Sequence, residues 1–264
     1  MALEHVAWIG GGTGSGKTTV ARLLAARHGL RAFHVDAFWY AYDARLREPE
    51  LTPDAQWLGQ TPEAQAAEFE ATSRRRLRLV FEDLADLPER PPILVEGPQV
   101  LPDALPGGAA AVFLVPTAEF QRALLEPRPL PPTADPPRAL AHRIEKDRLY
   151  AQRVAALARE HGFPLVEVDG SRPPEEIADE AERLLAPVLA RAAEPVDLRP
   201  VRRWSNQAVA ANLRSWLASA QAPAQAPRAY AFACECGRLG CAERVELSLA
   251  DFEATPQVLA PAHS

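Results

Sequence analysis

The feature that most constrains this chain is a glycine-rich motif close to its N-terminus. Residues 11–18 read GGTGSGKT and fit the pattern G-x-x-x-x-G-K-[ST] without a mismatch. An apolar run at residues 6–9 precedes the motif, and a helix-forming run at residues 19–26 follows it. This is the order of strand, loop and helix that a phosphate loop requires. The motif therefore predicts nucleotide binding.

The physical basis of this prediction is the backbone of the loop. Four glycines in six positions allow positive φ angles and turn the N–H groups inward. Together with the positive end of the following helix, these groups form a cradle for phosphates. Lys17 adds a charge on the phosphates, and the Thr18 hydroxyl is a ligand for Mg²⁺. The predicted nucleotide-binding residues are Gly11, Gly12, Thr13, Gly14, Ser15, Gly16, Lys17, Thr18 and Thr19.

Composition narrows the class of protein further. The formal charge of −6 gives no reason to expect a nucleic-acid partner. The N-terminus lacks a basic segment followed by a long apolar one, and no run approaches the roughly 18 apolar residues of a membrane span. We therefore expect a cytoplasmic protein without a membrane segment. All three cysteines fall between residues 234 and 241, and an odd number argues against a disulfide framework.

Strand and helix signals alternate over the first 190 or so residues. Apolar runs without alternation are typical of strands that are buried on both faces of a parallel sheet. We predict an α/β fold with three layers and a parallel sheet of about five strands. The expected strands are residues 6–9, 31–36, 93–97, 110–115 and 165–168.

The segments between the strands are expected to be mostly helical. Thr61, Thr117 and Ser171 are expected helix caps, and residues 139–161 and 206–218 are further predicted helices. Residues 37–60 and the proline-rich residues 127–137 read as irregular. We divide the chain into a nucleotide-binding domain (residues 1–192), a helix and linker (193–227, with a boundary at 194–195) and a small cysteine-rich module (228–264).

Two acidic residues follow predicted strands and are candidates for catalysis. Asp36 ends the second strand, and ligands of open α/β sheets bind at the carboxyl ends of strands. Its carboxylate could orient an acceptor hydroxyl and take its proton. Glu96 ends a buried apolar strand, where an acid is costly unless it faces a cation or donors. A water-mediated contact with Mg²⁺ would satisfy it; a turn or capping role is the alternative for both.

A third group of candidates lies on the predicted helix after the proline-rich segment. Arg143, Lys146 and Arg153 recur at helical spacing on one face, and Arg148 lies off this stripe. Cations that follow a flexible segment suit a lid that closes over phosphates. We predict that Arg143 or Arg148 reaches the phosphates, against the alternative of a solvated helix surface.

These residues together carry a family resemblance. The phosphate loop, the stretch Asp36-Ala37-Phe38-Trp39-Tyr40 and the run Val95-Glu96-Gly97 resemble P-loop kinases of the uridine kinase and nicotinamide riboside kinase type. The resemblance covers roughly residues 5–190. It implies a nucleoside- or nucleotide-kinase-like fold, with Asp36 as the acceptor-side acid and Glu96 as a metal-side or acceptor-side carboxylate. The chain departs from the family at Trp39 and in the proline-rich segment.

The cysteine-rich module carries a separate prediction. Cys234, Cys236 and Cys241 offer three soft ligands on a glycine-containing turn, whereas zinc takes four. The best fourth ligand is His263, near the end of the sequence. The region resembles short Cys-x-Cys-x4-Cys modules with a Pro-x-His tail in actinobacterial proteins. Structural Zn²⁺ is the prediction, and redox-active or merely buried cysteines are the alternatives.

Three functions are compatible with these features. The first is an ATP-dependent kinase that phosphorylates a hydroxyl of a nucleoside-like or other small molecule, with GTP as an alternative donor. The second is a kinase of the nucleoside monophosphate type, whose anionic acceptor would use Arg45, Arg47 or residues 74–76. The third is a nucleotide-dependent regulatory ATPase, with the cysteine-rich module as a metal- or redox-sensing head or as the binding site for a protein partner.

Overall fold

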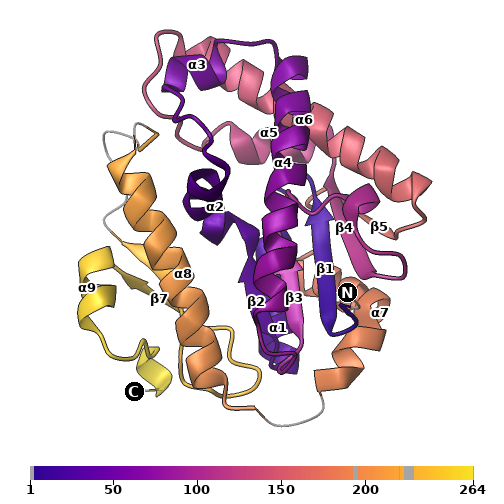
Figure 1. Ribbon diagram of the computed structural model, residues 1–264, viewed down its shortest axis with the longest axis vertical. Coiled ribbons are helices and arrows are strands. Elements are labelled where there is room, and N and C mark those ends of the chain that lie inside the picture. Colours follow the sequence, from indigo (N-terminus) through magenta and orange to yellow (C-terminus); the bar gives the residue numbers. More distant parts are fainter. Residues whose placement is uncertain (1–2, 193–195, 220, 223–228, 264) are drawn as a thin grey trace.

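The centre of the protein is a five-stranded sheet. The computed structural model describes residues 3–192, 196–219, 221–222 and 229–263. Every pairing in this sheet is parallel, in the order β2-β3-β1-β4-β5 (Figure 1). The strands are β1 (Val6–Gly11), β2 (Arg31–His34), β3 (Ile93–Glu96), β4 (Ala110–Pro116) and β5 (Leu165–Val168). All five predicted strands are confirmed.

Helices cover both faces of this sheet and bury the central strands β1 and β3 completely. The helices α1 (Lys17–His28) and α7 (Pro174–Leu189) pack on one face, and α4 (Pro62–Ala85) and α6 (Pro136–Glu160) pack on the other. Trp8 and its neighbour Ile9 are both fully buried, each in a different one of the two cores. The fold is therefore the predicted three-layer α/β architecture.

Most of the predicted helix starts are also confirmed. Side chains of Thr61 and Thr117 accept hydrogen bonds from the first turns of α4 and of α5 (Ala118–Leu125). The prediction for Ser171 was wrong, because α7 starts after Pro173 and the Ser171 hydroxyl instead donates to Asp169. A proline at the N-terminal boundary of a helix needs no partner for the N–H group it lacks.

The segment at residues 37–60, predicted to be irregular, is largely helical. A 3-10 turn (Val35–Phe38) leads into α2 (Trp39–Leu46), and α3 (Pro53–Trp57) follows. The aromatic residues of this segment pack on one another and on the sheet, as in the stacks of Phe38 on Phe33 and Tyr42. This packing adds stability that the local sequence pattern does not reveal.

The helix α8 (Leu198–Ala218) covers the edge of the sheet beside β2. Its Trp204 packs on Phe33 and Phe38, and the Ser205 hydroxyl donates to the Ala32 carbonyl at 3.0 Å. The helix thereby protects an edge strand that would otherwise expose its backbone. It begins eight residues before the predicted residue 206, because Asp197 caps its N-terminus. The predicted boundary at residues 194–195 and most of the linker lie outside the described residues.

The C-terminal module packs against α8. It consists of the antiparallel strands β6 (Tyr230–Ala233) and β7 (Arg244–Leu247), α9 (Leu249–Ala254) and a 3-10 turn (Pro261–His263). Phe232 and Phe252 stack in its small core, to which Ala210 of α8 contributes. The division of the chain into three parts stays a prediction.

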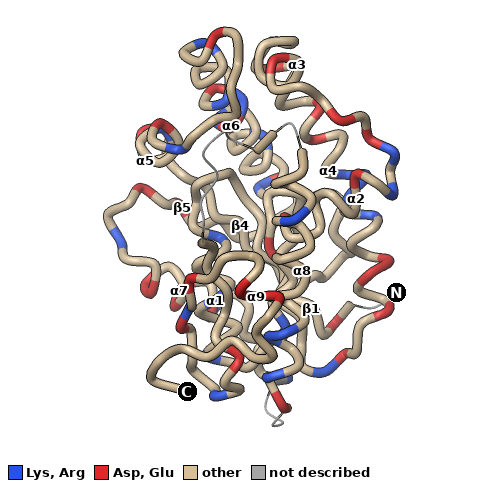
Figure 2. Tube along the Cα trace, turned by 90° about the vertical axis from the view of Figure 1, so that its left-hand side faces the viewer, with Lys and Arg blue, Asp and Glu red and all other residues tan. Residues whose placement is uncertain are grey.

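The surface carries charges of both signs. Figure 2 shows acidic and basic residues interspersed along the chain, as expected from its small net charge. None of the helices among the described residues is both long and apolar enough to cross a membrane.

Candidate active site

The phosphate loop connects β1 to α1. Gly16 has a φ of 80° and stands directly before the first residue of α1, Lys17. Gly11 approaches β4 so closely that a Cβ atom there would lie 1.9 Å from the Leu114 carbonyl oxygen. Both positions therefore require glycine, which explains why the loop is glycine-rich.

The side chain of Lys17, the first residue of α1, reaches back into this loop. Its Nζ donates to the Gly12 carbonyl at 2.6 Å and lies 3.4 Å from the Ser15 hydroxyl. Burial lowers the pKa of Lys17 because it disfavours the charged form. A bound phosphate would supply the charge that this buried ammonium lacks within the loop.

Glu96 lies at the end of β3 and is held by neighbours on two other elements. His34 stands opposite it on β2, and the imidazole Nδ1 lies 2.7 Å from the carboxylate. Thr18 donates to the same oxygen at 3.1 Å. Burial opposes ionisation, but the His34 hydrogen bond and the charges of His34 and Lys17 hold the pKa of Glu96 below its usual range.

Asp36 follows β2 and is the second buried carboxyl group of the site. The amide of Gln99 donates to it at 2.7 Å. Burial raises its pKa, and the nearby charge of Glu96 raises it further. The two carboxyl groups are therefore shifted in opposite directions, a pattern typical of sites with distinct acid and base roles.

A large cavity of about 840 Å³ opens over the phosphate loop. Residues 13–19 line one side of it. Phe120, Arg128 and the loop at residues 170–174 also line it. This volume is within the range of small-molecule and cofactor sites. The loop after β5 is suited to contact a base, because it borders the same cavity as the phosphate cradle.

A smaller cavity of about 300 Å³ lies between α1, α8 and the C-terminal module. Its apolar wall includes Leu30, Val209 and Leu213, and its charged residues include Arg22 and Arg244. Thr18, Asp36 and Glu96 line this cavity as well as the larger one. The two cavities thus border the same hydroxyl and the same two carboxyl groups.

The predicted lid cations are not among the residues that line these cavities. Arg143 donates to the carbonyls of Arg128 and Pro129 in the proline-rich segment, and Arg148 forms an ion pair with Glu145. Arg128 itself lines the larger cavity. The contact of Arg143 or Arg148 with phosphates stays a prediction. Arg128 is the arginine of the proline-rich segment that borders the cavity of the phosphate loop.

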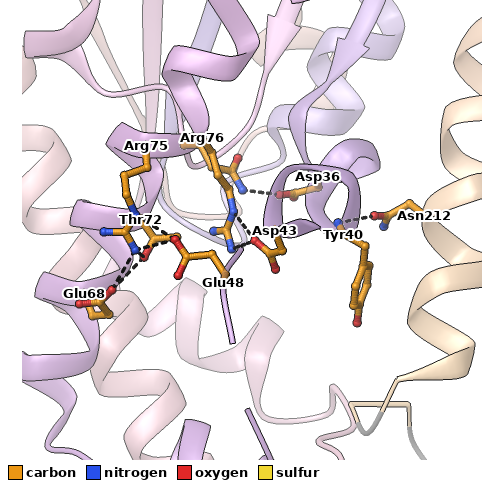
Figure 3. A network of polar contacts seen from close by, with 10 residues as sticks. Asp36, Tyr40, Asp43, Glu48, Glu68, Thr72, Arg75, Arg76 and Asn212 are labelled. Carbon is orange, nitrogen blue, oxygen red and sulfur yellow. Dashed lines mark hydrogen bonds and ion pairs between the residues drawn. The ribbon is translucent and has the colours of Figure 1, made fainter. Parts of the chain in front are cut away.

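The arginines considered for an anionic acceptor are mostly engaged elsewhere. Figure 3 shows Arg75 with Glu48 and Glu68, and Arg76 with Asp43. Arg76 also stacks on the Trp39 ring, 3.5 Å from its centroid. Arg45 and Arg74 form ion pairs of their own with Asp83 and Asp103, among other acids.

The cysteine-rich module brings its four predicted ligands together. The ligand atoms of Cys234, Cys236, Cys241 and His263 all lie within 4.8 Å of one another. His263 Nδ1 lies 3.4 Å from the Cys234 sulfur and 3.6 Å from the Cys241 sulfur. In a tetrahedral zinc site, bond lengths of about 2.3 and 2.0 Å place a sulfur and a nitrogen ligand roughly 3.5 Å apart. The cluster fits zinc.

Sequence reasoning missed several residues of the site. His34 could have been found, because its neighbour in register on an adjacent parallel strand is Glu96. Gln99 lies three residues after Glu96, in the loop that follows β3. Arg22 and Arg244 carry no comparable signal, because only the tertiary structure places them on one cavity.

Comparisons with known proteins add little to this description of the site. No family model and no curated protein matches the sequence. Among solved structures, the chain is similar to a shikimate kinase from Acinetobacter baumannii in complex with shikimate. The identity is 20%, the match covers 72% of this chain and 95% of that chain, and the TM-score is 0.41. We therefore base the function on the residues of the site.

Proposed function

We propose that the protein is an ATP-dependent kinase that transfers the γ-phosphoryl group to a hydroxyl of a small molecule. The observation that carries this proposal is the pair of cavities with Thr18, Asp36 and Glu96 in common. The larger cavity contains the phosphate loop and accommodates the donor. The smaller one is separate space for an acceptor, bordering the carboxylate that would take its proton.

The donor side of the site is suited to hold a triphosphate with its metal. The loop amides and Lys17 would bind the β- and γ-phosphates. The Thr18 hydroxyl and the Glu96 carboxylate present oxygen atoms next to the loop, and oxygen is the ligand that Mg²⁺ prefers. Bound there, Mg²⁺ would offset the charge of the phosphates.

Asp36 is the proposed general base. Its carboxylate accepts the proton of the acceptor hydroxyl while the hydroxyl oxygen forms its bond to the γ-phosphorus. The bond from phosphorus to the β–γ bridging oxygen breaks, and ADP leaves with the electron pair. A raised pKa makes Asp36 a stronger base than an exposed aspartate, and Gln99 fixes its orientation.

The first experiment measures ADP release with Mg·ATP across nucleosides, nucleoside monophosphates, sugars, hydroxy acids and vitamins. We expect one acceptor class to raise turnover well above the background. Lys17→Ala should lower kcat about 100-fold or more, because it removes a phosphate contact. Arg27→Ala is the matched control on the same helix, since Arg27 pairs with Asp179 and Glu182 outside both cavities.

The same panel decides between the proposal and its alternatives. Preference for monophosphates over nucleosides, with a nucleoside diphosphate as the product, would support a kinase of the nucleoside monophosphate type. Tight ATP binding with no response to any acceptor would contradict a kinase and support a regulatory ATPase. Full activity of Lys17→Ala would contradict the role of the phosphate loop.

We also propose that the cysteine-rich module holds one structural Zn²⁺. The sulfur–nitrogen distances of the cluster support this, as does the N–H group of Ala260, which donates to the Cys234 sulfur at 3.3 Å. Such hydrogen bonds stabilise a thiolate ligand. The metal would connect residues near the two ends of a module that has little core of its own.

A further inference from the structure

Arg22 lies on the wall of the smaller cavity, one helical turn beyond Thr18. Four residues of α1 correspond to about 6 Å along the helix axis, so both side chains project from the same face. The Arg22 Nε is buried and has no hydrogen-bond partner among the described residues. A buried guanidinium nitrogen without a partner is costly, and the half-buried Arg22 side chain lines the cavity.

Arg244 approaches the same cavity from the C-terminal module. It starts β7, directly after the loop that contains Cys241, and donates to the Ala231 carbonyl at 2.5 Å. Burial lowers the pKa of Arg244, and the positive charge of Arg22 lowers it further. The charges of the two arginines therefore act on each other, and the Arg244 side chain is exposed.

No acid among the described residues forms an ion pair with either arginine. The third arginine of the cavity is different, because Arg202 donates to the carbonyls of Cys234 and Arg238. Glu243, exposed on the Cys241 loop, lines the cavity beside Arg244, and the charge of Glu246, two residues further along β7, acts on Arg244 from outside the cavity lining. With Arg22, Arg202 and Arg244 among the lining residues, this side of the cavity keeps an excess of positive charge.

The remaining acids of the cavity are already engaged. Glu96 is held by His34 and Thr18, and Asp36 accepts from Gln99, while Lys17 is the cation near both. The cavity thus has an acidic end at the site of phosphoryl transfer and a basic end about one helical turn away.

We propose that the phosphoryl acceptor carries an anionic group, a carboxylate or a phosphate, which binds between Arg22 and Arg244 while its hydroxyl faces Asp36. This inference rests on the proposed kinase function and specifies its substrate class. The apolar wall at Leu30, Val209 and Leu213 contacts the carbon skeleton between these groups. Oriented guanidinium groups are well suited to carboxylate and phosphate oxygens.

The first test measures anion binding without turnover. Inorganic phosphate and, separately, acetate are titrated calorimetrically into protein that is saturated with Mg²⁺ and a non-hydrolysable ATP analogue, so that the phosphate loop is occupied. We expect one of the two anions to bind, and the preferred one identifies the group. Arg22→Gln and Arg244→Gln should each weaken binding about tenfold or more, because each removes a charge-assisted hydrogen bond.

Arg214→Gln is the matched control, because Arg214 is an exposed arginine of α8 that pairs with Glu253. It removes the same charge and should leave anion binding unchanged. Unchanged melting temperatures of the three variants would show that the fold is intact. No binding of either anion to the wild type, or equal binding to the Arg22→Gln/Arg244→Gln double variant, would overturn the proposal.

The second test uses the best acceptor found by the ADP assay and its neutral analogue. Arg22→Gln and Arg244→Gln should raise the acceptor KM about tenfold or more and leave the KM for ATP unchanged. A neutral best acceptor, or an unchanged acceptor KM, would overturn the inference but leave the kinase proposal standing. A panel without any acceptor would instead contradict the kinase proposal, and the anion titration would still decide whether the subsite exists.

Discussion

At the scale of single residues, the site depends on two buried carboxyl groups with opposite pKa shifts. Glu96 has three neighbours that stabilise its charge. Burial and the charge of Glu96 disfavour the charged form of Asp36, and the hydrogen bond from Gln99 offsets only part of this. Ionisation of Asp36 in the folded protein therefore costs stability. Such a cost is typical of a residue that is retained for its chemistry.

The substitution Asp36→Asn separates the chemical role of this carboxylate from its cost in stability. We expect it to lower kcat about 100-fold or more, because the general base is lost. We also expect it to raise the melting temperature at neutral pH by a few degrees, since ~1 kcal/mol corresponds to about 2–4 °C in a protein of this size. Enzyme assays and thermal unfolding of the nucleotide-free protein check both. A variant that is both active and less stable would contradict the assigned role.

The pH dependence of activity follows from the same shift. Because Asp36 must be ionised to accept a proton and its pKa is raised, kcat/KM should fall with decreasing pH at values above the ordinary aspartate pKa of about 3.8. A pH–rate profile of the wild type with saturating Mg·ATP gives the apparent pKa. An acidic limb at or below the ordinary value would exclude Asp36 as the group that titrates.

Glu96 and Asp36 contribute to the pH dependence of stability with opposite signs, because their pKa values are shifted in opposite directions. The pKa of Glu96 is depressed in the folded state, so its contribution to stability is present above the unfolded pKa of about 4.5 and is lost as pH falls through the folded value. The wild type should therefore lose more stability on acidification than Glu96→Gln. Thermal unfolding of both proteins between about pH 3 and 7 tests this. Parallel curves would show that the pair with His34 adds nothing.

At the scale of elements, α8 connects the sheet to the C-terminal module. Asn206, which is 3% exposed, donates to the Ala233 carbonyl and to the Glu235 carboxylate and accepts from the Ala233 amide. Asn206→Ala should cost about 2–4 kcal/mol, because it leaves buried partners unsatisfied. Urea unfolding measures this loss, with Ser215→Ala on the exposed side of α8 as the control. A loss as small as that of the control would mean that water replaces these contacts.

The elements also show which features could be predicted from the sequence. Strands buried on both faces are apolar without interruption, and a threonine cap next to a proline marks a helix start, so β1–β5 and α4 were predicted correctly. The helices between residues 37 and 60 were missed because their aromatic packing overrides weak local propensity. The early start of α8 was missed because Pro200 falls in its first turn, where proline is tolerated.

At the scale of the whole molecule, the site joins residues that lie far apart in the sequence. The phosphate loop, Asp36 and Glu96 could be placed together, because parallel strands end at one edge of the sheet. The smaller cavity could not be predicted, because tertiary packing places α8 on β2 and the Cys241 loop on the end of α1. The amide of Gly240, for example, donates to the Ala26 carbonyl at 2.7 Å.

This packing means that the cysteine cluster and the smaller cavity belong to one structural unit. Cys241 is a proposed zinc ligand, and the residues from Cys241 to Arg244 line the cavity. We expect purified protein to contain about one zinc per chain, and chelation to lower its stability by several kcal/mol. Chelation should also raise the acceptor KM, or weaken anion binding, far more than it affects ATP binding, because the phosphate loop lies on β1 and α1.

Metal analysis, thermal unfolding and ATP titration before and after chelation test this expectation, and added zinc should reverse each change. Cys241→Ser should reproduce the effect of chelation, because it removes a ligand from the loop that holds Arg244. Ser215→Ala, on the exposed side of α8 and outside the lining of both cavities, serves as a control for a small polar substitution. If metal-free protein melted at the same temperature and bound the acceptor equally well, hydrogen bonds such as Gly240 to Ala26 would be sufficient to hold the loop, and the cysteines would have another role.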